Sequence, residues 1–449
     1  MGLFDRLATH DQRVVFLGID GVPFSLIENE PDVFENLTQL MEAGIARPID
    51  SVMPPESSAC WPALTTGENP GATGVYGFQE RKPDSYETYV PTASHVNEPR
   101  IWDRVTEAGR NATVLNVPVT YPPDTQQQRM VSGFLSPSIE AASHPPGIEE
   151  MLHANDYRID VNARLGHQAD KSAFFADAEA TLTARYETFL EFIRQDDWDL
   201  FFGVFMTTDR VNHFAFADYE QDGENRDAFL EFYRTLDTYI GNLREAIPDE
   251  VPLVIASDHG FTTLTHEVDL NAWLRDEGLL AYQVEDPDRL AHIDPTSTAY
   301  ALVPGRIYLN VSGREPDGFV AKADYHQIRN EIKRKLESLT APTGESVIER
   351  VVEREAAFEG DSVASAPDLV ALPRDGYDLK AGFDATAPVV STGPRNGMHT
   401  FENATLIVDE AVSVPTDPDL LAIAPLLSEL LGLEGQSDGE ESLIESPKQ

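Results

Sequence analysis

The chain carries little positive charge. Its 449 residues include 33 Lys and Arg against 77 Asp and Glu, which gives a formal net charge of −44. Such a surface disfavours nonspecific binding to nucleic acid or to an anionic membrane. It is also typical of a protein that works in molar salt, where the Debye length shrinks to about 3 Å and self-repulsion is screened. We therefore expect a halophilic protein without a nucleic-acid-binding surface.

Thiols and long apolar runs are equally scarce. The single cysteine, Cys60, excludes an internal disulfide. The most apolar stretch, residues 200–206, is far too short to span a bilayer. The first residues contain neither the apolar region of a signal peptide nor a twin arginine. We expect a cytoplasmic protein with no membrane segment, and the hydrophobic content of 41% is enough for a large core.

Three short apolar runs each lead into acidic residues. They cover residues 14–19, 200–206 and 251–257, and they lead to Asp20, to Asp209 and to Asp258. Near-continuous apolar runs are typical of strands that are covered on both faces. Helical patterns at 179–194 and 227–246 alternate with them, which predicts an α/β fold with a mostly parallel central sheet flanked by helices. Ligands of such sheets bind at the carboxyl ends of the strands.

The sequence pattern predicts an inserted lobe in the middle of the chain. Residues 263–394 are expected to form a smaller α+β lobe that covers the site and selects the substrate. Residues 1–262 and 395–433 would form the main domain, and residues 434–449 an acidic flexible tail. The expected elements are strands around a Pro-Gly turn within 299–310, a helix at 325–339, an extended stretch at 347–355, a strand at 404–408 and a helix at 420–431.

Three carboxylates and three imidazoles are placed to bind metal. Asp20 and the pair Asp258-His259 follow strands, Asp209 and His213 are one helical turn apart, and His399 lies in a polar loop that contains glycine. Six such ligands are enough for two divalent ions. Mixed nitrogen and oxygen ligation suits Zn²⁺ best, with Mn²⁺ as the alternative.

The stretch from residue 54 to residue 67 offers several nucleophiles. Ser57, Ser58, Cys60, Thr65 and Thr66 all carry a hydroxyl or a thiol. A serine here could be a nucleophile at a helix N-terminus, where free N–H groups can face an anion, or it could be the N-cap of that helix. The two threonines are expected to pack or to cap the end of the helix before Gly67.

Together these motifs resemble the alkaline phosphatase superfamily. The order Asp20-Gly21, residues 54–74, Thr208-Asp-Arg-Val-Asn-His213, Ser257-Asp-His-Gly-Phe261 and Gly397-Met-His399 is similar to that of the type I phosphodiesterase/nucleotide pyrophosphatase group, in its prokaryotic phosphohydrolase form. The resemblance implies that Asp209, His213 and His399 hold one metal and that Asp20, Asp258 and His259 hold the other. In the frame Pro-Pro-x-Ser-x-x-x-Trp it implies that Ser57 is the nucleophile and contacts the ions. Such a role fits a helix that begins at Ser58 or Ala59, and Ser58 is expected to be a cap.

The implied function is a two-metal phosphohydrolase. It would cleave a phosphodiester or pyrophosphate bond of a small-molecule phosphate ester through a phosphoserine. Phe78 stands where nucleotide pyrophosphatases place an asparagine, which weakens the case for nucleotides. The alternatives are a phosphomonoesterase, a phosphotransferase resembling cofactor-independent phosphoglycerate mutase, and a metal-stabilised binding module without turnover. Cys60-Trp-Pro also matches the start of the sulfatase signature, but Leu64 stands where its arginine would be, so we interpret Cys60 as a packing residue.

Overall fold

A large mixed sheet forms the centre of the protein. The computed structural model describes residues 12–410 and 418–433, so the predicted tail at 434–449 lies outside the described residues. Five neighbouring strands of the eight-stranded sheet, from β9 (Leu253–Ala256) to β6 (Arg129–Val131), run parallel, which confirms the predicted fold class. The strand order is β2 (Ile45–Ile49), β18 (Ala404–Val408), β9 (Leu253–Ala256), β1 (Val14–Ile19), β8 (Leu200–Phe205), β5 (Ala112–Leu115), β6 (Arg129–Val131) and β7 (Ser143–His144).

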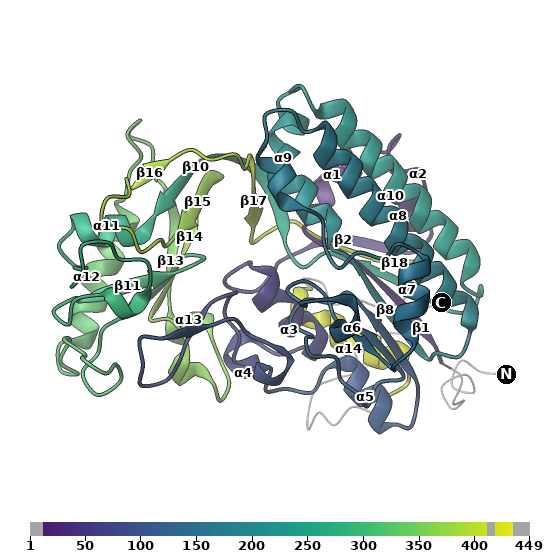
Figure 1. Cartoon of the computed structure of the whole chain (residues 1–449), viewed down its shortest axis with the longest axis horizontal. Coiled ribbons are helices and arrows are strands. Elements are labelled where there is room, and N and C mark those ends of the chain that lie inside the picture. Colours follow the sequence, from purple (N-terminus) through teal and green to yellow (C-terminus); the bar gives the residue numbers. More distant parts are fainter. Residues whose placement is uncertain (1–11, 411–417, 434–449) are drawn as a thin grey trace, which may run out of the picture.

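Helices cover both faces of this sheet (Figure 1). One face carries α1 (Phe24–Asn29), α2 (Glu35–Ala43), α8 (Ser172–Gln195), α9 (Thr207–Glu220) and α10 (Arg226–Ala246); the other carries α3 (Ser57–Thr66), α5 (Ile101–Glu107) and α14 (Ile423–Leu430). Along β1, Val15 and Leu17 pack into the first layer, whereas Val14 and Phe16 pack into the second. All six residues of β1 are buried, which explains why its sequence is an unbroken apolar run.

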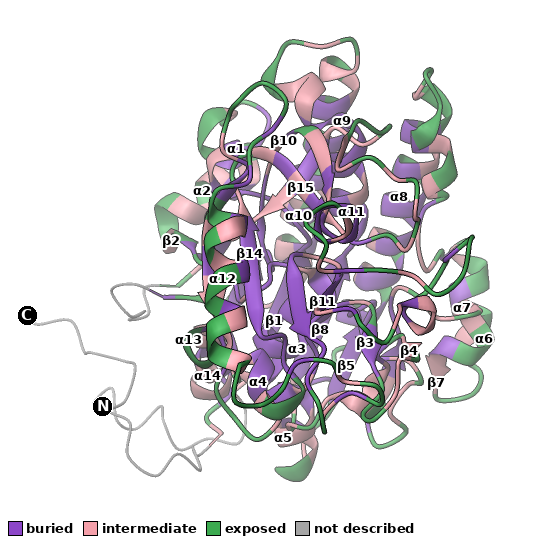
Figure 2. Cartoon of the chain, turned by 90° about the vertical axis from the view of Figure 1, so that its left-hand side faces the viewer, coloured by how far each residue is buried: buried purple, intermediate pink, exposed green. Residues whose placement is uncertain are grey.

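A second body with its own apolar core lies beside the main sheet. Its buried cluster is drawn from residues 268 to 381. Strand β10 (Gly260–Asp269) leaves the main body at its first residue, and β17 (Gly397–Thr400) returns antiparallel to it (Figure 1). Figure 2 shows the buried strands of this lobe behind α12. The elements are β10 (Gly260–Asp269), α11 (Leu270–Asp276), β11 (Ala299–Leu302), β12 (Arg306–Leu309), α12 (Tyr325–Glu337), β13 (Ile348–Glu353), α13 (Arg354–Ala357), β14 (Leu369–Pro373), β15 (Gly376–Lys380), β16 (Val390–Ser391) and β17 (Gly397–Thr400).

The lobe is docked on the main body through buried ion pairs. The fully buried Arg306 donates to Glu80 Oε1 at 3.0 Å and to the Gln79 carbonyl at 2.7 Å. Arg81 pairs with Glu315 at 3.2 Å. These contacts hold the lobe against the segment that follows α3. The short elements not yet named are α4 (Pro70–Thr73), β3 (Glu80–Arg81), β4 (Thr88–Tyr89), α6 (Ile139–Ala142) and α7 (Ile148–Ala154).

The predicted strands and helices of the main body are confirmed, and the polar strands of the lobe are the main omission. Residues 260–269 form one long strand, although their sequence mixes threonine, histidine and acidic residues, so no apolar pattern predicts it. The expected helix at 420–431 begins with the 3₁₀ turn Leu420–Ala422 and continues as α14. Among the described residues, no helix has both the length and the apolar character needed to cross a membrane.

Candidate metal centre and nucleophile

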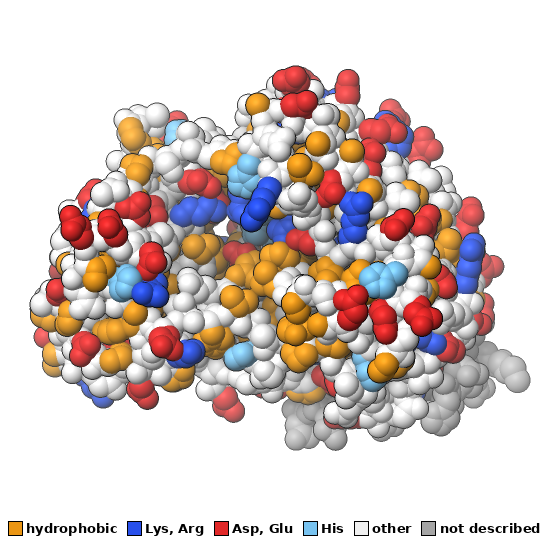
Figure 3. Space-filling view, in the orientation of Figure 1, with side chains coloured by type: hydrophobic (Ala, Val, Ile, Leu, Met, Phe, Trp, Pro, Cys, Tyr) orange, Lys and Arg blue, Asp and Glu red, His pale blue; other side chains and the backbone are white. Residues whose placement is uncertain are grey.

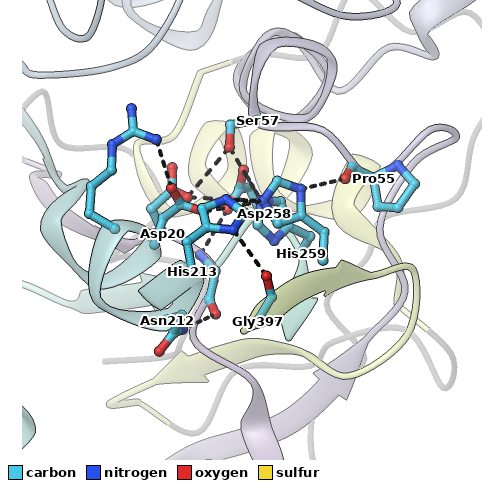
Figure 4. A network of polar contacts seen from close by, with 12 residues as sticks. Asp20, Pro55, Ser57, Asn212, His213, Asp258, His259 and Gly397 are labelled. Atoms are coloured by element: carbon cyan, nitrogen blue, oxygen red, sulfur yellow. Dashed lines mark hydrogen bonds and ion pairs between the residues drawn. The ribbon is translucent and has the colours of Figure 1, made fainter. Parts of the chain in front are cut away.

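The ends of three parallel strands bring the predicted ligands together. Asp20 directly follows β1, and Asp258 and His259 follow β9. Asp209 is the third residue of α9, the helix that follows β8, and His213 lies one turn further along the same face. His399 comes from β17, which pairs with β10 at the same edge. Figure 4 shows Asp20, Asp258, His213 and His259 turned toward one another beneath Ser57.

All three imidazoles are held in the same way. Each ring has its Nδ1 next to a backbone carbonyl: His213 by Gly397 at 3.2 Å, His259 by Gly260 at 3.1 Å, and His399 by Pro55 at 3.0 Å. A carbonyl can only accept, so Nδ1 must be the donor. In the neutral ring the lone pair then lies on Nε2, the atom that faces the carboxylates. This is the arrangement by which a backbone carbonyl orients a metal-ligating histidine.

The ligand atoms converge closely enough to share metal ions. Two groups, Asp20 with Asp258 and His259, and Asp209 with His259 and His399, have ligand atoms within 4.8 Å of one another. His213 Nε2 completes the second group, at 3.3 Å from Asp209 Oδ1 and 3.1 Å from His399 Nε2. Asp258 Oδ2 is buried and has no hydrogen-bond partner among the described residues. Asp258 Oδ2 also lies 3.4 Å from His259 Nε2. Facing lone pairs and a buried carboxylate oxygen that accepts no hydrogen bond fit divalent cations.

The electrostatics of the carboxylates reflect their crowding. Burial, followed by the neighbouring Asp258, raises the pKa of Asp20 well above its usual value. Burial likewise raises the pKa of Asp258, to about 7. Burial acts in the same direction on Asp209, but His213, His399 and Arg210 outweigh it and hold its pKa well below the usual value. Three clustered carboxylates can all be ionised only if cations compensate their charge.

Ser57 lies over this cluster. It is the first residue of α3, and its Oγ is 3.2 Å from His259 Nε2 and 3.5 Å from Asp20 Oδ1. The helix therefore begins one or two residues earlier than expected. The predicted cap role of Ser58 is wrong: Glu56 is the N-cap residue, and the buried Ser58 hydroxyl has no partner among the described residues.

The other candidate nucleophiles have structural surroundings. Cys60 is completely buried with its Sγ 3.2 Å from Ser51 Oγ, and burial raises the pKa of its thiol well above the usual value. Thr65 and Thr66 donate to helix carbonyls at 2.7 Å and 2.8 Å, and the Thr66 hydroxyl also accepts from the Glu68 N–H as the helix ends.

The sequence did not predict a role in the site for Trp61 or for Arg210, which both contact the ligand carboxylates. Trp61, buried in α3, donates from Nε1 to Asp20 Oδ2 at 2.7 Å and so orients that carboxylate. Arg210 donates to Asp160 at 3.0 Å and to Asp209 at 3.1 Å, and its guanidinium lies 4.4 Å from the ring centre of Phe134. The tryptophan lies one helical turn after Ser57, a spacing that could have signalled a contact with the site.

A cavity of about 420 Å³ opens above Ser57 between the main body and the lobe. Its walls are largely apolar, and Phe78 and Phe134 meet edge to face at 5.4 Å on the side of the main body. Basic side chains gather at the same hollow (Figure 3). The lobe thus forms one wall of the cavity, with lining residues that include Val303, Pro304, Leu372, Leu379 and Lys380.

Comparison with solved structures identifies the fold. It is alkaline phosphatase-like, as the motifs predict. It is similar to phosphonoacetate hydrolase from Sinorhizobium meliloti 1021 in complex with phosphonoformate, at a TM-score of 0.58 and 16% identity over 94% of this chain and 96% of that one. It is also similar to murine ectonucleotide pyrophosphatase/phosphodiesterase 5, at a TM-score of 0.57 and 14% identity over 96% and 98%.

The sequence family is narrower than the fold. Residues 14–402 match the type I phosphodiesterase/nucleotide pyrophosphatase family, and the chain belongs to that family. No curated protein sequence matches it. The protein is accordingly a phosphohydrolase of the phosphodiesterase and pyrophosphatase type, which agrees with the prediction from its motifs. Enzymes of this type use divalent metals, and the ligand groups described above are the candidates to hold them.

Proposed function

We propose that the protein hydrolyses a small-molecule phosphodiester or pyrophosphate with two divalent cations, through a phosphoserine at Ser57. Asp20, Asp258 and His259 would hold one ion, and Asp209, His213 and His399 the other. The observation that carries the proposal is the orientation of the imidazoles, whose Nε2 atoms face the carboxylates next to Ser57 Oγ. Three nitrogen and three oxygen ligands suit Zn²⁺ best, with Mn²⁺ second.

The chemistry needs an ionised serine and a stabilised phosphoryl group. When bound, the cations would lower the pKa of the serine hydroxyl and offset the charge on the phosphoryl oxygens. Ser57 Oγ attacks phosphorus, a new P–O bond to Ser57 forms, and the bond to the departing alcohol or phosphate breaks. Water then attacks the phosphoserine, breaks its P–O bond and restores the hydroxyl. Each displacement proceeds in line, so two of them retain the configuration at phosphorus.

The surroundings of Ser57 fit this sequence of events. No side chain caps the N-terminus of α3, and the Ala59 N–H donates to the Glu56 carbonyl at 2.8 Å, which leaves the N–H groups of Ser57 and Ser58 to bind phosphoryl oxygens. Trp61 and Arg210 orient Asp20 and Asp209 by hydrogen bonds. The apolar walls of the cavity, including Phe78, exclude water and fit the organic part of an ester. Because these walls can hold the organic group of a second ester, the cavity favours a diester over a monoester as substrate.

The test compares two aryl phosphates in high salt with added Zn²⁺ or Mn²⁺. We expect faster hydrolysis of bis-p-nitrophenyl phosphate than of p-nitrophenyl phosphate. Ser57→Ala should bind the metals and lower kcat by at least about 10⁴-fold, as loss of a nucleophile does in other enzymes. Preference for the monoester would favour a phosphomonoesterase, and full activity of metal-loaded Ser57→Ala would refute the phosphoserine.

A further inference from the structure

We infer that Arg395 binds a second anionic group of the substrate, a carboxylate or a phosphate separate from the phosphoryl group that reacts. The inference rests on the proposed function, because it assumes that the reacting phosphoryl group binds beside Ser57. It narrows the substrate class to phosphate esters that carry another negative charge.

Arg395 differs from the other cations of the cavity. Arg210 is fully engaged with Asp160 and Asp209, and Lys380 is engaged with Asp378 and lies 3.9 Å from Glu267. Arg395 lines the same cavity and is partly buried. Within residues 12–410 and 418–433, the structure gives it neither a hydrogen bond nor an ion pair. An arginine that forms no ion pair with a carboxylate is notable in a chain with a net charge of −44.

The backbone next to Arg395 is fixed by the metal centre itself. The Asn396 N–H donates to the His213 carbonyl at 2.9 Å, and the Asn396 side chain donates to Asp218 at 3.0 Å. The Asn396 carbonyl accepts from the Leu264 N–H at 2.8 Å. The guanidinium is therefore carried on a rigid base beside the site, while its own donors remain available. Basic side chains are visible in the hollow in Figure 3.

The chemistry of this arrangement points to anion recognition. A guanidinium presents a planar fork of donors that matches a carboxylate or a phosphate, and such hydrogen bonds are about twice as strong as neutral ones. Asp378 lines the same cavity. Burial acts to raise the pKa of Asp378, but the charges of Lys380, His399 and Arg395 outweigh it, so this carboxylate lies near Arg395 although no ion pair joins the two. The ion pair of Asp378 is with Lys380, which leaves the N–H donors of the Arg395 guanidinium for a ligand.

Calorimetry on the metal-loaded protein tests the inference without turnover. The probes are propylphosphonate, phosphonopropionate and ethylenediphosphonate, which share one phosphonate and differ in the second group. We expect the wild type to bind at least one of the two doubly anionic probes about ten- to a hundredfold more tightly than propylphosphonate, the range of a charge-assisted hydrogen bond. The preferred probe identifies the second group as a carboxylate or a phosphate.

Two variants complete the test. Arg395→Gln should bring the affinity ratio close to one, whereas Arg334→Gln, which removes an exposed arginine on α12, should keep the ratio of the wild type. Equal weakening of all three probes by Arg395→Gln would assign Arg395 to the reacting phosphoryl group and overturn the inference. No preference in the wild type would overturn it as well. Neither outcome depends on Ser57, whose loss tests the proposed function separately.

Discussion

The hydrogen bond between Trp61 and Asp20 can be tested against a matched tryptophan. Trp61 and Trp102 are both completely buried, and both rings meet Phe202 edge to face, at 6.4 Å and 5.4 Å between ring centres. Trp61 donates to Asp20, whereas the Nε1 atom of Trp102 has no partner among the described residues. Replacing either tryptophan by phenylalanine removes a similar ring volume, but only Trp61→Phe also removes a hydrogen bond.

The magnitudes follow from that difference. Truncation of a buried tryptophan to alanine costs about 3–5 kcal/mol, so the partial loss in Trp102→Phe should cost about 1–2 kcal/mol of the free energy of unfolding. Trp61→Phe should lose the same amount plus about 1.5–3 kcal/mol for a hydrogen bond to an ionised carboxylate in the metal-loaded protein. Loss of such an orienting contact should also weaken metal binding by about 10- to 100-fold.

Two assays measure these effects. Chemical denaturation of the metal-loaded proteins gives the free energies of unfolding, and competition with a chelator gives the metal affinities. We expect Trp102→Phe to bind metal as the wild type does. Equal loss of metal affinity in the two variants would refute the role of the Trp61 hydrogen bond and would leave only packing.

Three further predictions concern packing and accessibility. Arg306→Met should lower the free energy of unfolding by about 3–5 kcal/mol, because Glu80 stays buried without a cation. Adding Glu80→Gln to this variant should recover part of the loss. A loss below about 1 kcal/mol in the Arg306→Met variant alone would contradict this role. Cys60 should resist iodoacetamide near pH 8 in the folded protein and react after unfolding, since burial raises its thiol pKa; rapid labelling of the folded protein would show that it is accessible. Gly18→Ala should destabilise the protein, because the new Cβ would lie 2.4 Å from Trp61 Cη2, and a midpoint of thermal unfolding equal to that of the wild type would show that the ring can move.

The apolar strands and their acidic ends could be predicted because both depend on local sequence. A strand buried on both faces must be apolar along its length, as β1 is, and parallel strands deliver their last residues to one edge. Asp20, Asp209 and Asp258 could therefore be grouped from the order of residues alone. The choice of Ser57 among neighbouring hydroxyls came from the resemblance to a family rather than from the spacing of residues.

The rest depends on contacts between distant segments. Trp61 meets Asp20 across 41 residues, and Glu80 meets Arg306 across 226. Neither pair has a periodic signal, because each is defined by how the layers pack. The start of α3 was misplaced for a related reason: Glu56 is the N-cap residue without a side-chain hydrogen bond, so the usual preference for a serine cap did not apply. The halophilic and cytoplasmic character remains a prediction from composition.

The stereochemical course at phosphorus tests the central claim most directly. A phosphorothioate diester of known configuration would be hydrolysed in isotopically labelled water by the metal-loaded protein, and the configuration of the product determined. Transfer through Ser57 involves two in-line displacements and predicts retention of configuration. Inversion would mean that water attacks phosphorus directly, and it would contradict the phosphoserine.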